Sequence, residues 1–141
     1  RVLFRSNFHP STAAEARFSV PFVVATALVY GSVRLAAFTD ERLQDPRIRD
    51  LMQRMELTVN PALDAAFPGQ RAAHVRIVTH DGQQGEFLQP TRKGDPDAPL
   101  SDNDLSAKFL ELAEPVLGQD KAARLLDRIW TLEAVLHIRD L

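Results

Sequence analysis

Three polar side chains near the start of the chain have the chemistry to hold an anion. In the stretch HPSTAAEARFSVPF, residues 9–22, His9 precedes a capped helix, and Arg17 and Ser19 lie in its opening turns. A guanidinium beside a helix N-terminus, with a hydroxyl nearby, can hold a carboxylate through charge-assisted hydrogen bonds and the helix dipole. We therefore name His9, Arg17 and Ser19 as candidate carboxylate-binding residues. The alternative for Arg17 is structural: its side chain reaches solvent or pairs with Glu15 or an acidic loop.

The other polar residues and motifs give weaker evidence for a metal, catalytic or phosphate-binding site. His74 and His80 share strand parity but lie too far apart along the strand for one metal ion, so we predict no metal site. The chain has no G-x-S-x-G motif, and its GQQG lies inside a hairpin rather than between a strand and a helix. Arg92 and Lys93 could close over an anionic substrate or belong to a solvated linker. We assign no catalytic acid or base and no cofactor.

Composition narrows the class of protein. The 141 residues suffice for one ordinary domain, or for a small domain plus part of a neighbour, with 45% hydrophobic residues. A net charge of -2 provides no basic field for nucleic acid. The longest apolar run is shorter than the roughly 20 residues of a membrane span and contains Pro21. From the charge and the short apolar run we expect no nucleic-acid and no membrane partner. The absence of cysteine fits a reducing compartment, so we expect a cytoplasmic protein.

The elements that must position the candidate residues begin with one helix. Thr12 and Glu15 form a predicted capping box. From residue 18 to residue 30 nearly every position is apolar, which predicts a helix buried on most sides. Pro21 should kink or break this helix, and Gly31 should end it.

The middle of the chain predicts a helix followed by strands. Asp45 is a predicted N-cap with Pro46 at the first helical position. Residues 56–59, ELTV, read as a short strand, and residues 61–70 read as a connection. Alternating apolar residues before and after Asp81-Gly82 predict a hairpin with one buried face.

The polar, Pro- and Gly-containing residues 91–100 predict a linker. Ser101 with Asp104 should cap the helix that follows it, and Gly118 should end that helix. Residues 119–141 read as a last helix, with Leu136 on its apolar stripe and Trp130 in the core. Because helices and strands segregate along the chain, the sequence predicts an α+β fold.

Two ordered motifs carry a family resemblance. Residues 9–33 resemble the segment P-x-x-x-x-E-A-K/R-F-S-x-P/Q-Y-x-x-A-x-A-L-x-x-G of the MmgE/PrpD family. The matching residues are Glu15, Ala16, Arg17, Phe18, Ser19, Pro21, Ala25, Ala27, Leu28 and Gly31. Residues 92–109 are similar to the family's G-x-P-x-x-P-L-S-x-x-x-L-x-x-K-F. The matching residues there are Gly94, Pro96, Pro99, Leu100, Ser101, Leu105, Lys108 and Phe109. The resemblance covers nearly all of residues 9–135 and departs at Phe22, where a hydroxylated aromatic is common.

The resemblance implies an architecture. Members of the family have an all-helical domain interrupted by a smaller α+β lid, with the active site between them. It implies that residues 7–97 are most of a lid with a small antiparallel sheet flanked by helices, and that residues 98–141 are C-terminal helices of the helical domain. Residues 1–6, RVLFRS, read as the translation of a sequencing-library adapter, so we expect native sequence from about Asn7.

The resemblance also implies an activity. The family includes 2-methylcitrate dehydratase and cis-aconitate decarboxylase, lyases that act on small polycarboxylates. We therefore expect the C-terminal part of a cofactor-independent lyase resembling 2-methylcitrate dehydratase, a homodimer at full length. The family's main acid and base residues lie mostly upstream of this segment, so the segment alone should be inactive. An isomerase or epimerase of the same family and a stand-alone, non-catalytic binding or assembly module remain as alternatives.

Overall fold

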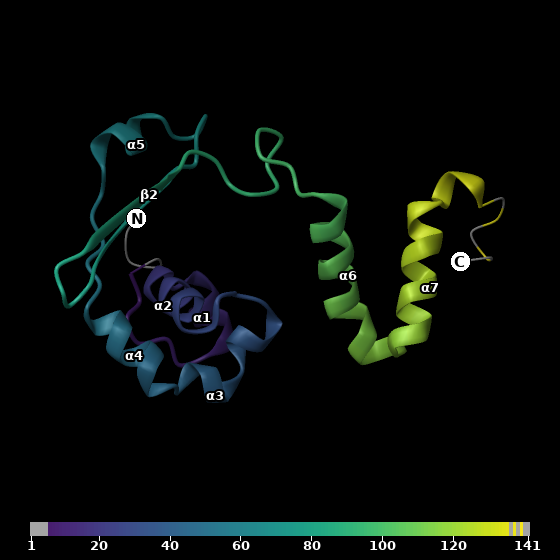
Figure 1. The fold of residues 1–141 in the computed structure, drawn as a ribbon, viewed down its shortest axis with the longest axis horizontal. Helices are drawn as coiled ribbons and strands as arrows, with labels where there is room; N and C mark the ends of the chain where they lie inside the picture. The colour runs from purple at the N-terminus through teal and green to yellow at the C-terminus, as the bar shows by residue number, and fades with distance from the viewer. Residues whose placement is uncertain (1–5, 136, 138, 140–141) are drawn as a thin grey trace. The chain divides into compact units, whose positions relative to one another are not determined.

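The computed structural model describes residues 6–135, 137 and 139. It forms two compact units, Arg1–Val59 and Asn60–Leu141. Figure 1 shows that the first unit is helical and that the second carries an antiparallel hairpin and a pair of helices, which confirms the predicted α+β class. The boundary predicted at residues 97 and 98 stays a prediction. In the described part of the chain, every helix is too short or too polar to cross a bilayer.

The apolar stretch near the start forms two helices, α1 (Ala13–Phe18) and α2 (Val20–Tyr30), broken at Ser19. Ser19 has extended backbone angles (φ -89°, ψ 106°), so it ends α1 and caps α2. Pro21 then lies in the first turn of α2, where its missing N–H removes no helical hydrogen bond. Gly31 ends α2 in the left-handed conformation at φ 74°. The predicted break and the predicted end are both confirmed.

The core of the first unit lies where α2 packs on α4 (Pro46–Gln53). Only one side of α2 faces this core, since Val20 and Leu28 expose 37% and 50% of their surface. The prediction of a helix buried on most sides is therefore wrong for this chain. The buried hydrophobic cluster consists of Ala16, Phe22, Ala25, Leu43, Ile48 and Met52.

Short elements connect these two helices. The 3-10 helix η1 (Leu35–Phe38) leads into α3 (Asp40–Leu43). Asp45 then starts α4 as predicted, because its carboxylate accepts the Arg47 N–H at 2.9 Å.

The strand predicted at residues 56–59 is absent from the described structure, where these residues have no strand partner. Leu57 and Val59 alternate as strand residues do, yet they expose 39% and 65% of their surface. The prediction is wrong because the period-2 pattern alone does not supply a neighbouring strand. The next residue, Asn60, caps the short helix α5 (Pro61–Ala65), so the predicted connection begins as a helical turn.

Strands β1 (Ala73–Val78) and β2 (Gln84–Gln89) form the predicted antiparallel hairpin. Val75 lies opposite Phe87 in the register, so Val75, Ile77 and Phe87 share one face. They expose 36%, 41% and 65% of their surface. The prediction of one buried face is therefore wrong here, because both faces of the two-stranded sheet are open.

Helices α6 (Asp102–Leu117) and α7 (Gln119–Trp130) pack against each other and are joined at Gly118. The predicted capping box of Ser101 and Asp104 is confirmed. The last helix ends at Trp130 and is followed by η2 (Leu132–Ala134), so it is shorter than predicted, and Leu136 lies outside the described residues.

Trp130 is not a core residue. Its side chain is 46% exposed, and its indole N–H donates to the Ser106 hydroxyl at 3.0 Å. A pair of helices has no third layer to cover a side chain this large, and α6 contributes no buried residue to the described structure.

Candidate functional site

The Ser19 hydroxyl is fully buried at the break between α1 and α2. It accepts a hydrogen bond from the Phe22 N–H at 3.2 Å, and it donates one to the Asn7 carbonyl at 2.5 Å. The first contact caps α2, and the second fastens the segment before α1 to the break. In this chain the hydroxyl therefore positions the backbone around it.

His9 lies on the segment that Ser19 fastens. Its side chain is exposed, and its backbone N–H donates to the Asn7 side-chain oxygen at 2.9 Å. The same segment is held from α4, where the Arg49 guanidinium donates to the carbonyls of Pro10 at 2.9 Å and Leu43 at 2.8 Å. The structure thus brings the backbone near His9 to Ser19 through Asn7.

Arg17 occupies the last turn of α1 and is exposed. Its guanidinium carbon lies 5.3 Å from the centre of the Phe38 ring. The alternative pairing with Glu15 does not form, because that carboxylate instead accepts hydrogen bonds from the Ser11 N–H and hydroxyl, at 2.7 and 3.0 Å. These bonds lower the pKa of Glu15. Arg17 has no carboxylate partner among the described residues, so it can offer its charge to a ligand.

Two aromatic rings connect Arg17 to Ser19. The Arg17 guanidinium lies over the Phe38 ring, and the Phe38 ring packs against that of Phe22, with 6.2 Å between the two ring centres. Phe22 is fully buried, and its N–H is the one that the Ser19 hydroxyl caps. The family commonly has a hydroxylated aromatic at the position of Phe22, whereas in this chain the Phe22 ring is part of the buried core. The arrangement fixes Arg17 by packing, a link that spacing alone did not reveal.

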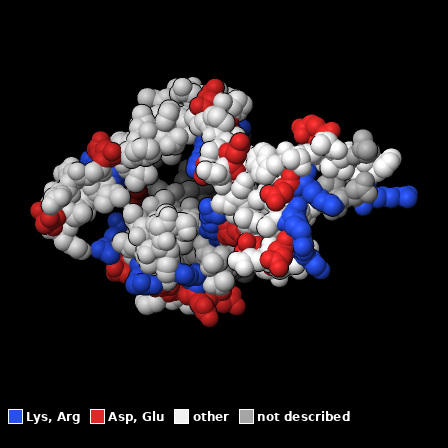
Figure 2. Space-filling view, turned by 45° about the vertical axis from the view of Figure 1, so that its right-hand side comes forward, with Lys and Arg blue, Asp and Glu red and all other residues white. Residues whose placement is uncertain are grey.

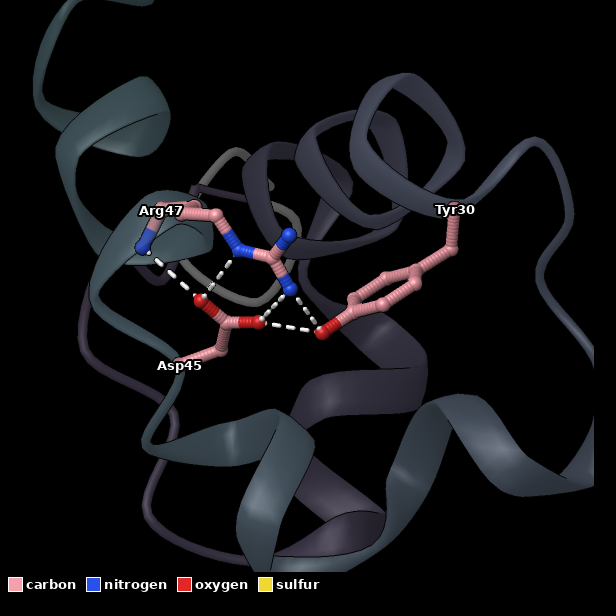
Figure 3. Close-up of polar contacts among 3 residues, drawn as sticks. All are labelled: Tyr30, Asp45 and Arg47. Atoms are coloured by element: carbon pink, nitrogen blue, oxygen red, sulfur yellow. Dashed lines mark hydrogen bonds and ion pairs between the residues drawn. The ribbon is translucent and has the colours of Figure 1, made fainter.

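A second polar cluster joins the end of α2 to the start of α4 (Figure 3). The Tyr30 hydroxyl donates to the Asp45 carboxylate and accepts from the Arg47 guanidinium at 2.6 Å. Arg47 also donates to Asp45 at 2.8 and 3.2 Å, and its hydrogen bonds lower the pKa of that carboxyl. The Arg42 guanidinium lies over the Tyr30 ring, at 3.1 Å from its centre.

This cluster locks two helices together. In Figure 3 the Tyr30 hydroxyl, the Asp45 carboxylate and two nitrogens of the Arg47 guanidinium contact one another, and Asp45 also caps α4, which leaves no ready acid or base. The sequence identified Asp45 as a cap but missed Tyr30, because its partner lies 15 residues away and no local pattern links them.

The cations of the linker are paired. Arg92 forms an ion pair with Asp95 at 2.8 Å, and Lys93 forms one with Asp104 at 2.9 Å. The hydrogen bond from Lys93 comes first among the causes that lower the pKa of Asp104 to about 2. Of the two readings of these residues, the geometry favours a turn fastened to the start of α6 over a loop that closes on an anion.

The histidines of the hairpin remain separate from any metal-binding group. The His74 Nε2 atom lies 3.6 Å from a Glu86 carboxylate oxygen on the facing strand. In the part of the chain that the structure describes, no three His, Asp or Glu side chains gather as metal ligands would.

The chain is similar to curated enzymes. It is 27% identical to the cis-aconitate decarboxylase of Mus musculus over 124 residues, which is 88% of this chain and 25% of the mouse protein. The human cis-aconitate decarboxylase is also 27% identical over 124 residues, 88% of this chain and 26% of that protein. The cis-aconitate decarboxylase-like protein oryM of Aspergillus oryzae is 25% identical over 133 residues, covering 94% of this chain and 27% of its own length.

The chain therefore spans about a quarter of the length of the curated relatives it matches. A family model, the MmgE/PrpD C-terminal domain, matches residues 1–134. This match covers both motifs on which the resemblance rested, as well as the candidate residues His9, Arg17 and Ser19. The chain belongs to the MmgE/PrpD family and represents its C-terminal domain.

Proposed function

We propose that this chain is the C-terminal part of a cofactor-independent lyase that acts on small di- or tricarboxylates. The match of the family model over residues 1–134 carries the proposal, and the names of the relatives support it. Those names favour decarboxylation of cis-aconitate over dehydration of 2-methylcitrate. Both reactions need cations on the substrate carboxylates, together with an acid and a base at the reacting carbons.

The contribution of this segment is a cation at the edge of the substrate site. Arg17 is exposed, has no carboxylate partner among the described residues, and lies on a packed aromatic ring. An arginine held in this way can form a bidentate contact with a carboxylate without first giving up another partner. In this proposal Ser19 and the segment that contains His9 position the backbone beside Arg17, and neither residue acts as an acid or a base.

The acid and base come from the remainder of the polypeptide in this proposal. The Asp104 carboxylate accepts a hydrogen bond from Lys93, and this bond is the largest cause that lowers its pKa to about 2. A general base needs a pKa near the working pH, and a carboxyl held near 2 is a poor one.

The test compares Arg17→Ala with Arg71→Ala in the full-length enzyme. Arg71 is a matched control, because its guanidinium lies 5.5 Å from the centre of the Phe67 ring in the same type of contact. With cis-aconitate or 2-methylcitrate as substrate, Arg17→Ala should raise KM at least tenfold, or about 1.4 kcal/mol, and Arg71→Ala should leave it unchanged. Arg17→Lys should recover part of the loss.

Two results would contradict the proposal. If the full-length protein turns over neither acid, the lyase assignment fails, and the isomerase or the binding-module alternative replaces it. If turnover is present but Arg17→Ala leaves KM unchanged, the enzyme stands and the carboxylate contact at Arg17 is wrong.

A further inference from the structure

One arginine of α4 holds two backbone segments that lie far apart in the sequence. The Arg49 Nε atom donates to the Leu43 carbonyl at 2.8 Å, and its Nη2 atom donates to the Pro10 carbonyl at 2.9 Å. Leu43 ends α3, and Pro10 lies on the segment before α1, 39 residues from Arg49. Because the donors of a guanidinium are fixed in one plane, Arg49 holds these two carbonyls at a set separation.

The neighbouring arginines make a different kind of contact. Figure 2 shows basic and acidic side chains interspersed on the visible face of the molecule. Arg47 pairs with the Asp45 carboxylate at 2.8 Å. Arg54, at the C-cap of α4, pairs with Asp50 at 2.6 Å, and both arginines are exposed. Arg49 is half-buried and donates to backbone carbonyls, so its contacts fix the backbone.

The two segments that Arg49 holds lead to Arg17 and to Phe38. Pro10 precedes α1, whose last turn carries Arg17. Leu43 ends α3, which follows η1, the element that contains Phe38. α1 packs against both η1 and α3. The Arg17 guanidinium and the Phe38 ring, 5.3 Å apart, therefore belong to the two parts of the chain that Arg49 joins.

Hydrogen bonds along the first segment connect the Arg49 contact to α1. Ser11 follows Pro10, and its N–H and hydroxyl donate to the Glu15 carboxylate of α1 at 2.7 and 3.0 Å. The segment is also tied at Asn7, whose carbonyl accepts from the buried Ser19 hydroxyl at 2.5 Å. Because the segment is held at both Asn7 and Pro10, it cannot turn about either point, and the start of α1 has a fixed direction.

We propose that Arg49 is a positioning residue for the carboxylate contact of Arg17. It touches no substrate and acts by joining α1 to the η1 and α3 segment, which keeps the Arg17 guanidinium over the Phe38 ring. The effect on substrate rests on the proposed function, whereas the placement of Arg17 is a property of the chain itself. A cation held in place before binding loses less conformational freedom when the substrate arrives, so it binds more tightly than a mobile one.

The first test measures the placement of Arg17 by NMR in the 141-residue chain, without substrate. The ring current of Phe38 shifts the side-chain protons of an arginine that lies over it, and Phe38→Leu should abolish this shift. Arg49→Gln should remove at least half of the same shift. Arg49→Lys should do so as well, because an ammonium group does not reproduce the planar pair of donors. Arg54→Gln, which breaks an ion pair at the end of the same helix, should leave the shift unchanged.

The second test is a double-mutant cycle in the full-length enzyme. Arg49→Gln should raise KM at least threefold for the acid that the enzyme turns over, with kcat changed less than twofold. In an Arg17→Ala background it should raise KM no further, because Arg49 acts through Arg17. A residue that only stabilised the fold would show the same effect in both backgrounds. Circular dichroism checks that each variant is folded.

Two results would overturn the proposal. One is an unchanged Arg17 shift in a folded Arg49→Gln or Arg49→Lys variant. The other is a pair of KM effects, from Arg49→Gln and Arg17→Ala, that multiply in the double variant. A full-length protein that turns over neither acid contradicts the lyase proposal, and the NMR result still decides whether Arg49 places Arg17. The two proposals therefore fail separately.

Discussion

Replacing Ser19 with alanine tests whether its hydroxyl holds the chain together at the break between α1 and α2. The hydroxyl is fully buried, caps the Phe22 N–H at 3.2 Å and donates to the Asn7 carbonyl at 2.5 Å. Losing an N-cap side chain costs about 1 kcal/mol. Losing the donor to the Asn7 carbonyl adds about 1 kcal/mol. We therefore expect Ser19→Ala to lower the free energy of unfolding by about 2 kcal/mol.

The assay is urea unfolding of the isolated chain, followed by far-ultraviolet circular dichroism, because the one tryptophan lies in the other compact unit. Thr12→Ala is the matched control. Thr12 also caps a helix, through the Glu15 N–H at 3.2 Å, but it is exposed, and its hydroxyl has no long-range hydrogen bond to the described residues. Its loss should cost about 0.5–1 kcal/mol.

A loss for Ser19→Ala no larger than that for Thr12→Ala would refute the structural role of the hydroxyl. The companion measurement is KM of the full-length enzyme. A variant of unchanged stability with a raised KM would return Ser19 to the role of a direct carboxylate ligand.

Two further predictions follow from polar contacts away from the break. Tyr30→Phe removes the hydroxyl that contacts both Asp45 and Arg47. Urea unfolding should therefore show a free energy of unfolding lower by about 1–2 kcal/mol. A change within about 0.3 kcal/mol would mean that Asp45 and Arg47 pair equally well without the hydroxyl. The second concerns acid. The pKa of Asp104 is lowered to about 2, first by the hydrogen bond from Lys93 and then by those from Ser101. A carboxyl whose folded pKa lies below its unfolded value of about 4 contributes stability above that value, and this stability is lost as the pH falls from about 4 to about 2. The acid titration of the Asp104 carboxyl, followed by NMR, should therefore move to higher pH in Lys93→Ala; an unmoved midpoint would contradict the assigned cause.

The ends of helices were predictable from sequence because they are local. Asp45 and Ser101 cap their helices through backbone amides two or three residues away, and Gly31 ends α2 because glycine adopts positive φ at little cost. The hairpin was predictable for the same reason, because its turn residues, Asp81 and Gly82, are adjacent in the sequence. The family motif around Arg17 and Ser19 was likewise readable, because its residues are contiguous along the chain.

Burial and long-range contacts required the folded chain. Trp130 is a large aromatic residue of the kind usually found in a core, but whether its side chain is buried depends on which elements pack beside α7. Residues 56–59 alternate like a strand, yet a strand is stable only with a neighbour to bond.

The candidate site shows the same division. The sequence placed a guanidinium and a hydroxyl two residues apart near a helix start. Folding then buried the hydroxyl of Ser19 as a cap and left Arg17 exposed on Phe38, 21 positions further along the chain. A contact over such a separation depends on how α1 and η1 pack together, which the residues around Arg17 do not determine by themselves.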